Sequence, residues 1–414
     1  MTYRGRANAA IRLAFVALWL PACSTVGTGN TAEDIALVRG TLNVVLGNRE
    51  GVVAMTDSMQ TVVSATGQTA QLREPGKKLF QLDAYTVCTI AGFGSASLPS
   101  APEFNASAAG IIERYAEELT RQPFRRASFR EKLSALSFLF EYYLTTIATI
   151  TLLTHGQRSP DASSYTFELI LAGYDDDLKP KIGRLSIRGT TVQVAGDSRI
   201  RAETWRLTTR AIEDDLTHEL AGQPAIAAAV IKDPNKMRDP AVQSYAASMT
   251  ADHGRSLTLD KLVAFGDALV GVTARAVPSV GGERQIAVLR GGRVQSLRGP
   301  RFQRAKAPMT FSLMSDSTIA GGRTAVAPGS SVLFVRSVLR QTAVPLDGNY
   351  FFGSRLEDCE VRYDGGVTRL DTTNEVNNCT LVLGPQAQRG SARVQQLLGA
   401  FQWKLVKDEV VPVK

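Results

Sequence analysis

Residues 40–58 read GTLNVVLGNREGVVAMTDS and carry the first strong structural signal of the chain. Two runs of apolar and β-branched residues, Leu42–Leu46 and Gly51–Met55, stand on either side of a turn at Gly47-Asn48. Runs of this length and composition, bounded by turn residues, are typical of β-strands. The stretch therefore predicts two neighbouring strands that begin directly after Gly40-Thr41.

The next segments extend this pattern and then change it. Lys78–Leu82 and Tyr85–Ala91 form a second strand pair, which predicts an antiparallel meander. Ala108–Leu119 has apolar residues at helical spacing, and Ser128 with Glu131 three residues later is a capping box that opens a second helix. We expect this second helix to lie buried between layers, because nearly all of its faces are apolar.

The remaining elements predict an α+β fold. Strands return at Tyr165–Ala172 and Ile182–Ile187, a polar and helix-rich stretch covers residues 200–276, and Gln285–Leu289 adds another strand. Helices that share the outside of two antiparallel sheets would form a four-layer αββα sandwich. We assign this domain to residues 40–294.

The composition changes after residue 294. Residues 295–330 are rich in Arg, Gly, Ala and Ser and are predicted to be a linker. Short strands dominate from residue 331 to residue 414, with a hairpin signal at Asp364-Gly365 and one helix at Ala392–Phe401. These residues are predicted to form a separate small β-rich α+β domain.

The N-terminal residues resemble an export signal. Several arginines precede the apolar run Leu13–Leu20, which is too short to span a bilayer. A small residue then precedes Cys23, as in a bacterial lipobox. We expect a signal peptide over residues 1–22, lipidation of Cys23, and a tether or pro-segment over residues 23–39. The mature protein would be periplasmic or an outer-membrane lipoprotein; the alternative is ordinary cleavage, with Cys23 incidental.

Composition argues against two kinds of partner. The net charge is +8, but the basic residues are spread along the chain without a basic stripe that includes aromatic residues. We therefore expect no nucleic-acid partner. The three histidines, His155, His218 and His253, have no cysteine or second histidine at metal-ligand spacing. No metal and no cofactor is predicted.

The cysteines other than Cys23 have different surroundings. Cys88 lies in an apolar run and is expected to be buried and unreactive. Cys359 and Cys379 are the remaining pair. In an oxidising compartment they could form a disulfide, and two reduced core thiols are the alternative.

One set of residues suggests chemistry. Thr41 follows a glycine, Asp57 lies 16 residues later, Lys78 opens the third strand, and Gly92 ends the fourth. In order and spacing, residues 40–294 resemble a proteasome β-subunit, one of the N-terminal-nucleophile hydrolases. The resemblance implies that the bond before Thr41 is cleaved and that Thr41 is then the nucleophile. It also implies that Asp57 and Lys78 support Thr41, and that the Gly92 N–H stabilises the oxyanion.

These residue types suit a threonine nucleophile. The α-amine of an N-terminal threonine can act as the base, because its reference pKa of about 7.7 to 8.0 lies close to neutral pH. The ammonium of Lys78 would lower that pKa by like-charge repulsion, and Asp57 would keep Lys78 charged and oriented. The predicted substrate is a peptide or amide. Because subunits of this family form rings, a homo-oligomer is left open.

Departures from the family pattern favour other hypotheses. The helper Asp and Ser of the family fall here on Val277 and Val280. The Ser-Gly-Ser segment before the third helix has only the partial match Gly196-Asp197-Ser198. A second hypothesis is therefore a lipid-anchored, catalytically inactive scaffold or binding lipoprotein with this fold. A third is a structural lipoprotein of the cell envelope that lacks it.

Overall fold

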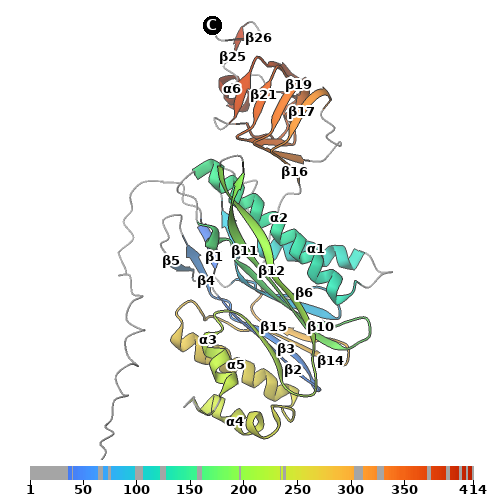
Figure 1. Cartoon of the computed structure of the whole chain (residues 1–414), viewed down its shortest axis with the longest axis vertical. Helices are drawn as coiled ribbons and strands as arrows, with labels where there is room; N and C mark the ends of the chain where they lie inside the picture. Colours follow the sequence, from blue (N-terminus) through green and yellow to red (C-terminus); the bar gives the residue numbers. More distant parts are fainter. Residues whose placement is uncertain are drawn as a thin grey trace, which may run out of the picture. The chain divides into compact units, whose positions relative to one another are not determined.

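The computed structural model gives the chain a mixed α+β fold with several sheets, which confirms the predicted class (Figure 1). Residues 1–35, which hold the predicted signal peptide and Cys23, lie outside the described residues, as does Gly40. The structure describes residues 36–39, 41–63, 69–72, 76–97, 106–121, 127–155, 161–194, 197–233, 235, 239–302, 311–323, 331–370, 374–387, 392–400, 403–406 and 409–412.

The strands predicted around Thr41 belong to an antiparallel sheet with the order β13-β2-β3-β14-β15. Its central hairpin pairs β2 with β3 through partners such as Val45 and Ala54. Both strands are buried along their whole length, which explains their continuous apolar runs. The strands are β2 (Leu42–Asn48), β3 (Gly51–Thr56), β13 (Thr217–Gly222), β14 (Gln285–Arg290) and β15 (Arg293–Arg298).

A second antiparallel sheet has the order β12-β11-β10-β7-β6 and contains the predicted second strand pair. The expected helix-rich stretch 200–276 is wrong in its first part, which forms β12 and β13. β12 lies at the sheet edge, where exposed charged and threonine side chains mask the alternation that marks a strand. The strands are β6 (Leu79–Gln81), β7 (Thr86–Gly92), β10 (Phe167–Tyr174), β11 (Pro180–Val194) and β12 (Asp197–Ala211).

Three apolar clusters connect these sheets and the helices. One cluster joins the two sheets, where Val45 and Ala54 of the first lie with Ile170 of the second. Another packs the first sheet against α3, α4 and α5, and a third packs the second sheet against α1 and α2 (Figure 1). The helices are α1 (Ala108–Arg121), α2 (Phe129–His155), α3 (Ala225–Lys232), α4 (Pro240–Asp252) and α5 (Leu259–Ala276).

Helix α2 opens with the predicted capping box. Ser128 Oγ accepts the N–H of Glu131 at 3.2 Å, and the Glu131 carboxylate accepts the N–H of Ser128 at 2.8 Å. By length and composition alone, the stretch Phe129–Leu152 could cross a membrane. In the structure it packs on the second sheet through residues such as Leu133 and Phe140, so burial in the protein accounts for its apolar character.

A third, smaller sheet has the order β5-β4-β1-β8-β9 and includes residues that precede Thr41. Its central strand, β1 (Ala36–Arg39), falls at the end of the predicted tether. A run of four residues is too short to show a strand pattern in the sequence. β1 pairs antiparallel with β4 and β8. The other strands are β4 (Gln60–Val63), β5 (Thr69–Leu72), β8 (Ser95–Ser97) and β9 (Ala106–Ser107).

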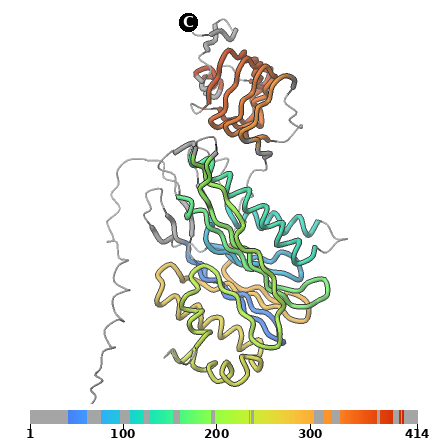
Figure 2. The backbone as a smooth tube through the Cα atoms, viewed as in Figure 1, coloured from blue at the N-terminus to red at the C-terminus, as the bar shows by residue number. Residues whose placement is uncertain are grey.

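The C-terminal part is built from parallel strands between residues 311 and 383, and only its last two strands, Trp403–Val406 and Glu409–Pro412, pair antiparallel among the described residues. Partners lie 20 or 17 residues apart, as in Phe311 with Ser331 and Val332 with Asn349. Paired strands therefore belong to successive turns of the backbone, which Figure 2 shows in orange. The predicted hairpin at Asp364-Gly365 is wrong. Gly365 does make a turn, with φ +101°, but β22 (Glu360–Tyr363) before it pairs in parallel with β24 (Thr380–Leu383) after it.

Strands occupy part of residues 295–330, which the sequence predicts to be a linker. The end of β15 and the whole of β16 and β17 lie within it, and β16 and β17 pair with β18 and β19. The elements are β16 (Phe311–Ser315), β17 (Thr318–Arg323), β18 (Ser331–Val335), β19 (Val338–Pro345), β20 (Asn349–Phe352), β21 (Arg355–Glu357), β22 (Glu360–Tyr363), β23 (Glu375–Asn377), β24 (Thr380–Leu383), α6 (Ala392–Ala400), β25 (Trp403–Val406) and β26 (Glu409–Pro412).

Cys359 and Cys379 occupy equivalent positions in successive turns, directly before β22 and β24. Both are buried free thiols, and the N–H of Cys359 donates to Sγ of Cys379 at 3.3 Å. Their disulfide stays a prediction. Cys88 is also a buried free thiol, and burial raises its pKa, in agreement with the predicted lack of reactivity.

Candidate active site

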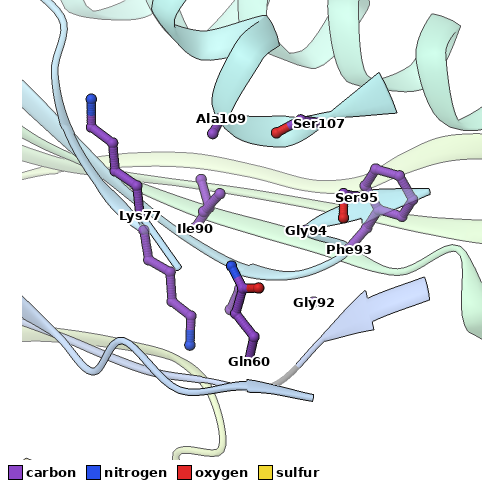
Figure 3. Close-up of a pocket in the computed structure, with 11 residues that line it drawn as sticks. Gln60, Lys77, Ile90, Gly92, Phe93, Gly94, Ser95, Ser107 and Ala109 are labelled. Carbon is purple, nitrogen blue, oxygen red and sulfur yellow. The ribbon is translucent and has the colours of Figure 1, made fainter. Parts of the chain in front are cut away.

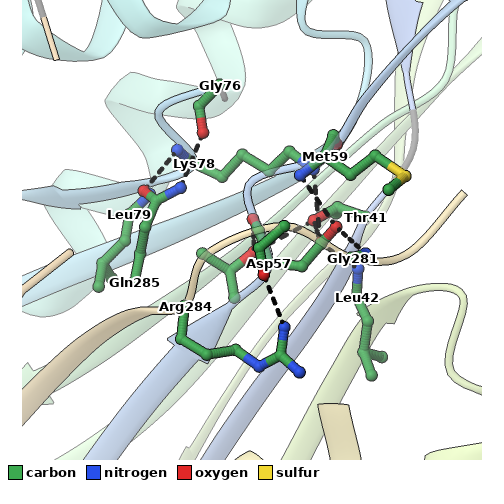
Figure 4. A network of polar contacts seen from close by, with 12 residues as sticks. Thr41, Leu42, Asp57, Met59, Gly76, Lys78, Leu79, Gly281, Arg284 and Gln285 are labelled. Carbon is green, nitrogen blue, oxygen red and sulfur yellow. Dashed lines mark hydrogen bonds and ion pairs between the residues drawn. The ribbon is translucent and has the colours of Figure 1, made fainter. Parts of the chain in front are cut away.

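Thr41 lies directly before β2, and only 1% of its surface is exposed. Its hydroxyl donates to the carboxylate of Asp57 (Figure 4). It also lies 3.1 Å from the hydroxyl of Thr56. Thr56 is the last residue of β3, the strand that pairs with β2, and Asp57 directly follows it. The hairpin therefore brings a buried carboxylate against the hydroxyl that is predicted to be the nucleophile.

The carboxylate of Asp57 is fully buried and held by backbone donors. Its Oδ1 accepts the N–H of Leu42 at 2.9 Å. Its Oδ2 accepts the N–H of Gly281 at 2.9 Å and that of Met59 at 3.2 Å. A carboxylate bonded in this way has a defined orientation, so the acceptor for the Thr41 hydroxyl is fixed in place.

Lys78 reaches the same carboxylate, with 3.4 Å between its Nζ and Oδ1 of Asp57. Its ammonium also donates to the carbonyl of Met59. The backbone beside it is anchored by Gln285, whose Oε1 accepts the N–H of Lys78 at 3.0 Å. Nε2 of Gln285 donates to the carbonyl of Gly76 at 2.7 Å (Figure 4). A side chain of β14 therefore positions the start of β6.

Lys78 is only 6% exposed, and this burial makes its ammonium easier to deprotonate. Desolvation lowers its pKa from 10.5 to about 8, while the charge and hydrogen bond of Asp57 act in the opposite direction. The structure thus brings Thr41, Asp57 and Lys78 together, as their spacing led us to expect. Their catalytic roles stay predictions.

Gly92 lines a small cavity beside this cluster (Figure 3). Its φ is +84°, and an added Cβ would lie 2.4 Å from the carbonyl oxygen of Thr166, so a side chain cannot be accommodated. The cavity measures about 80 Å³ and is lined by Gln60, Lys77, Lys78, Ile90, Ala91, Gly92, Phe93, Gly94, Ser95, Ser107 and Ala109. Gly92 shares it with Lys78, and its role as an oxyanion donor stays a prediction.

Strand β1 runs between two strands whose first residues line that cavity. Gln60 opens β4 and Ser95 opens β8. Val38 of β1 pairs with Val62 of β4 on one side and with Ser95 on the other. The chain just upstream of Thr41 is therefore held as an extended strand on both of its edges.

Two residues at the end of β13 contact Thr41 and were not predicted. The N–H of Gln223 donates to the carbonyl of Thr41 at 3.0 Å. Gly222 has φ +83°, and an added Cβ would lie 2.2 Å from the same carbonyl oxygen. The only sequence signal is the Gly-Gln-Pro break at residues 222–224, between a strand and a helix. The partial match at Gly196-Asp197-Ser198 is wrong, because Asp197 opens β12 rather than preceding a helix.

Val277 and Val280 are the positions at which the sequence resemblance implied helper residues. Val277 is the C-cap of α5, and Val280 is 2% exposed and packs in the apolar cluster under α5. The turn after them still serves Asp57, because Gly281 donates its N–H to the carboxylate. The backbone contact is therefore present without polar helper side chains at these two positions.

Among the acidic and histidine residues in the ranges that the structure describes, no group of three or more His, Cys, Asp and Glu side chains could hold a metal ion. Asp175 opens the turn between β10 and β11 and pairs with Lys181 at 2.5 Å. His218 lies on β13, where burial and then the charge of Arg210 lower its pKa.

Comparisons with known proteins give little beyond this geometry. No family model matches the chain, and no curated protein matches it. Among solved structures, the chain is similar to one titled Anbu (Gly-1) mutant from Hyphomicrobium sp. strain MC1. The TM-score is 0.37 and the identity 14%, over 63% of this chain and 87% of that one.

Proposed function

We propose that this chain is an exported threonine-nucleophile hydrolase, a peptidase or amidase, that activates itself by cleavage at Gly40-Thr41. The observation that carries the proposal is the buried cluster of Thr41, Asp57 and Lys78. We further propose a four-layer αββα sandwich as its framework, which the three apolar clusters between sheets and helices support.

The contacts suit the chemistry of a threonine nucleophile. With Thr41 at the N-terminus, its α-amine takes the proton from Oγ as Oγ attacks the substrate carbonyl. Asp57 accepts from the Thr41 hydroxyl and holds Lys78 close to it. The ammonium of Lys78 keeps the pKa of the nearby amine low, so the amine is a base near neutral pH.

Self-cleavage uses the same hydroxyl. Thr41 Oγ attacks the carbonyl carbon of Gly40, the carbon–nitrogen bond breaks, and an ester replaces the amide. The hydroxyl proton passes to the nitrogen in this step, so the Thr41 amine is already free in the ester. Water then hydrolyses the ester, which releases a chain ending in the Gly40 carboxylate and restores the Thr41 hydroxyl. The pairing of β1 on both edges supports this step, because it holds the upstream chain extended beside Thr41.

The same pairing favours a peptide as substrate. Departure of β1 after cleavage would leave the facing edges of β4 and β8 without a partner between them. An extended peptide can add to such edges through main-chain hydrogen bonds. The small cavity at the start of both strands would then receive one side chain of that peptide.

Intact-mass measurement on purified protein tests the proposal. We expect a chain that starts at Thr41, and Thr41→Ala should retain the full upstream segment. Thr273→Ala is a matched control, because Thr273 is also fully buried and its hydroxyl donates to Leu269 at 2.9 Å on α5. Retention of the upstream segment in the wild type, with no peptide or amide hydrolysis, would remove the proposal.

A second candidate is an inactive scaffold or binding lipoprotein with this fold. The valines at positions 277 and 280 favour it, because neither can supply the polar helper group that the family uses. In that case the chain stays uncut, Thr41→Ala changes nothing, and a bound partner protein replaces a substrate. Co-purification from envelope extracts separates the two candidates, because a scaffold would bind the same partner protein with and without Thr41→Ala.

Export and anchoring form a further part of the proposal. A lipid on Cys23 and a free amine on Thr41 cannot belong to one continuous chain, so cleavage would release the catalytic part from the membrane. Labelling with a fatty-acid analogue, compared between wild type and Cys23→Ala, tests the anchor. Cell fractionation of Thr41→Ala should find the whole protein at the membrane, and a cytoplasmic protein would contradict export.

A further inference from the structure

Charged side chains from both sheets meet near Thr41. Glu168 is on β10, Arg184 is on β11, and Glu219 is on β13 of the other sheet. Their side chains are 17%, 13% and 12% exposed, in that order. Partly buried charges at such a place need partners to offset their lost hydration, so their contacts are expected to be specific.

Arg184 links the two carboxylates. Its Nη2 lies 2.5 Å from Oε1 of Glu168, and its Nη1 lies 2.8 Å from Oε1 of Glu219. Nη1 also donates to the carbonyl of Leu220 at 3.0 Å. One guanidinium therefore ties the second sheet to the last residues of β13, in a fork geometry that a lysine cannot reproduce.

Glu168 carries this link to the backbone that contacts Thr41. Its Oε2 accepts the N–H of Gly222 at 2.8 Å. The next N–H along the chain, that of Gln223, donates to the carbonyl of Thr41 at 3.0 Å. Gly222 also has no space for a side chain, because an added Cβ would lie 2.2 Å from the Thr41 carbonyl oxygen.

We propose that Glu168, held by Arg184, is a positioning residue for Thr41. It fixes Gly222 and Gln223, and through them the carbonyl of Thr41, while Asp57 fixes the hydroxyl of the same residue. The inference rests on the proposed function, in which Thr41 is the nucleophile. Loss of the link lets the Thr41 backbone shift relative to Asp57, and small displacements of a nucleophile reduce turnover strongly.

Glu168→Gln tests the inference, because glutamine keeps an acceptor for Gly222 but turns an NH2 group toward Arg184. We expect kcat to fall roughly 10- to 100-fold, with KM changed less than about twofold. We also expect faster hydrogen exchange at the Gln223 amide, which can be measured even in a protein without activity.

Asp175→Asn is the matched control at the opposite end of β10. Asp175 is also 17% exposed, pairs with a cation at 2.5 Å, and accepts a backbone N–H, that of Phe129, at 2.9 Å. It should lose stability to a similar degree without a change in kcat or in exchange at Gln223.

The outcomes separate the inference from the proposed function. An active wild type with unchanged kcat in Glu168→Gln, or with equal losses in Asp175→Asn, overturns the positioning role. An inactive wild type in which Glu168→Gln still speeds exchange at Gln223 supports the structural link and removes the proposed function instead. Unchanged exchange at Gln223 in Glu168→Gln overturns the inference whether or not the protein is active.

Discussion

The backbone N–H of Gly281 donates to the carboxylate of Asp57 at 2.9 Å, across 224 residues of sequence. The same turn also accepts from the other side, because the carbonyl of Gly281 takes the N–H of Ser58 at 3.1 Å and that of Met59 at 3.0 Å. Pairing of β3 with β14 brings the two segments together. Backbone groups from segments far apart in the sequence therefore orient the acid that contacts Thr41.

Asp57→Asn tests whether this arrangement requires a charge. The amide NH2 would face backbone donors, and the ammonium of Lys78 would lose its carboxylate. We expect the free energy of unfolding to fall by about 3 kcal/mol, and cleavage before Thr41 to stop. Chemical denaturation and intact mass measure the two effects. The double variant with Lys78→Met should recover part of the stability, and losses that simply add would contradict the coupling.

The lowered pKa of Lys78 predicts a pH dependence of stability. Its pKa is about 8 in the folded protein and 10.5 ordinarily, so the unfolded chain binds more protons between these values. The free energy of unfolding should therefore rise by up to about 3 kcal/mol from pH 8 to pH 10.5, relative to Lys78→Met. Denaturant titrations of both proteins check this. Parallel curves would show that Lys78 titrates normally.

Asn43 predicts a stabilising substitution. It is fully buried on β2, and neither polar atom of its side chain has a hydrogen-bond partner among the described residues. An unpaired buried amide costs about 1–3 kcal/mol, so Asn43→Leu should raise the Tm. Asn48→Leu should lower it, because Asn48 donates to Gly254 at 3.1 Å and Leu257 at 2.8 Å. A lower Tm for Asn43→Leu would contradict this prediction.

The neighbouring thiols of Cys359 and Cys379 predict that mild oxidation joins them in a disulfide. The hydrogen bond from Cys379 lowers the pKa of Cys359, which raises its thiolate fraction. After mild oxidation we expect the intact mass to fall by about two hydrogens, and thiol labelling at both positions to stop. Cys359→Ser should abolish the mass change while Cys88→Ser leaves it. Labelling of both thiols after oxidation would support the reduced pair.

Sequence patterns located the elements whose signals are local. The hairpin of residues 42–56 and the capping box at Ser128 and Glu131 follow from short-range periodicity and turn residues, whereas the family resemblance singled out the sixteen-residue step from Thr41 to Asp57. A hairpin brings its two ends together by itself, so proximity of Thr41 and Asp57 could be predicted. β12 and the parallel C-terminal strands could not, because edge polarity and non-adjacent pairing hide their pattern.

By itself, then, the sequence determined which strand pair carries Thr41 and Asp57, and the α+β class. Tertiary structure alone decided what surrounds them. The contacts of Gly281 with Asp57 and of Gln223 with Thr41 join segments far apart in the chain, and they are made by backbone N–H groups that every residue type except proline carries. Apart from the Gly-Gln-Pro break at residues 222–224, no residue type or spacing signals such contacts, because they depend on how the two sheets pair and pack.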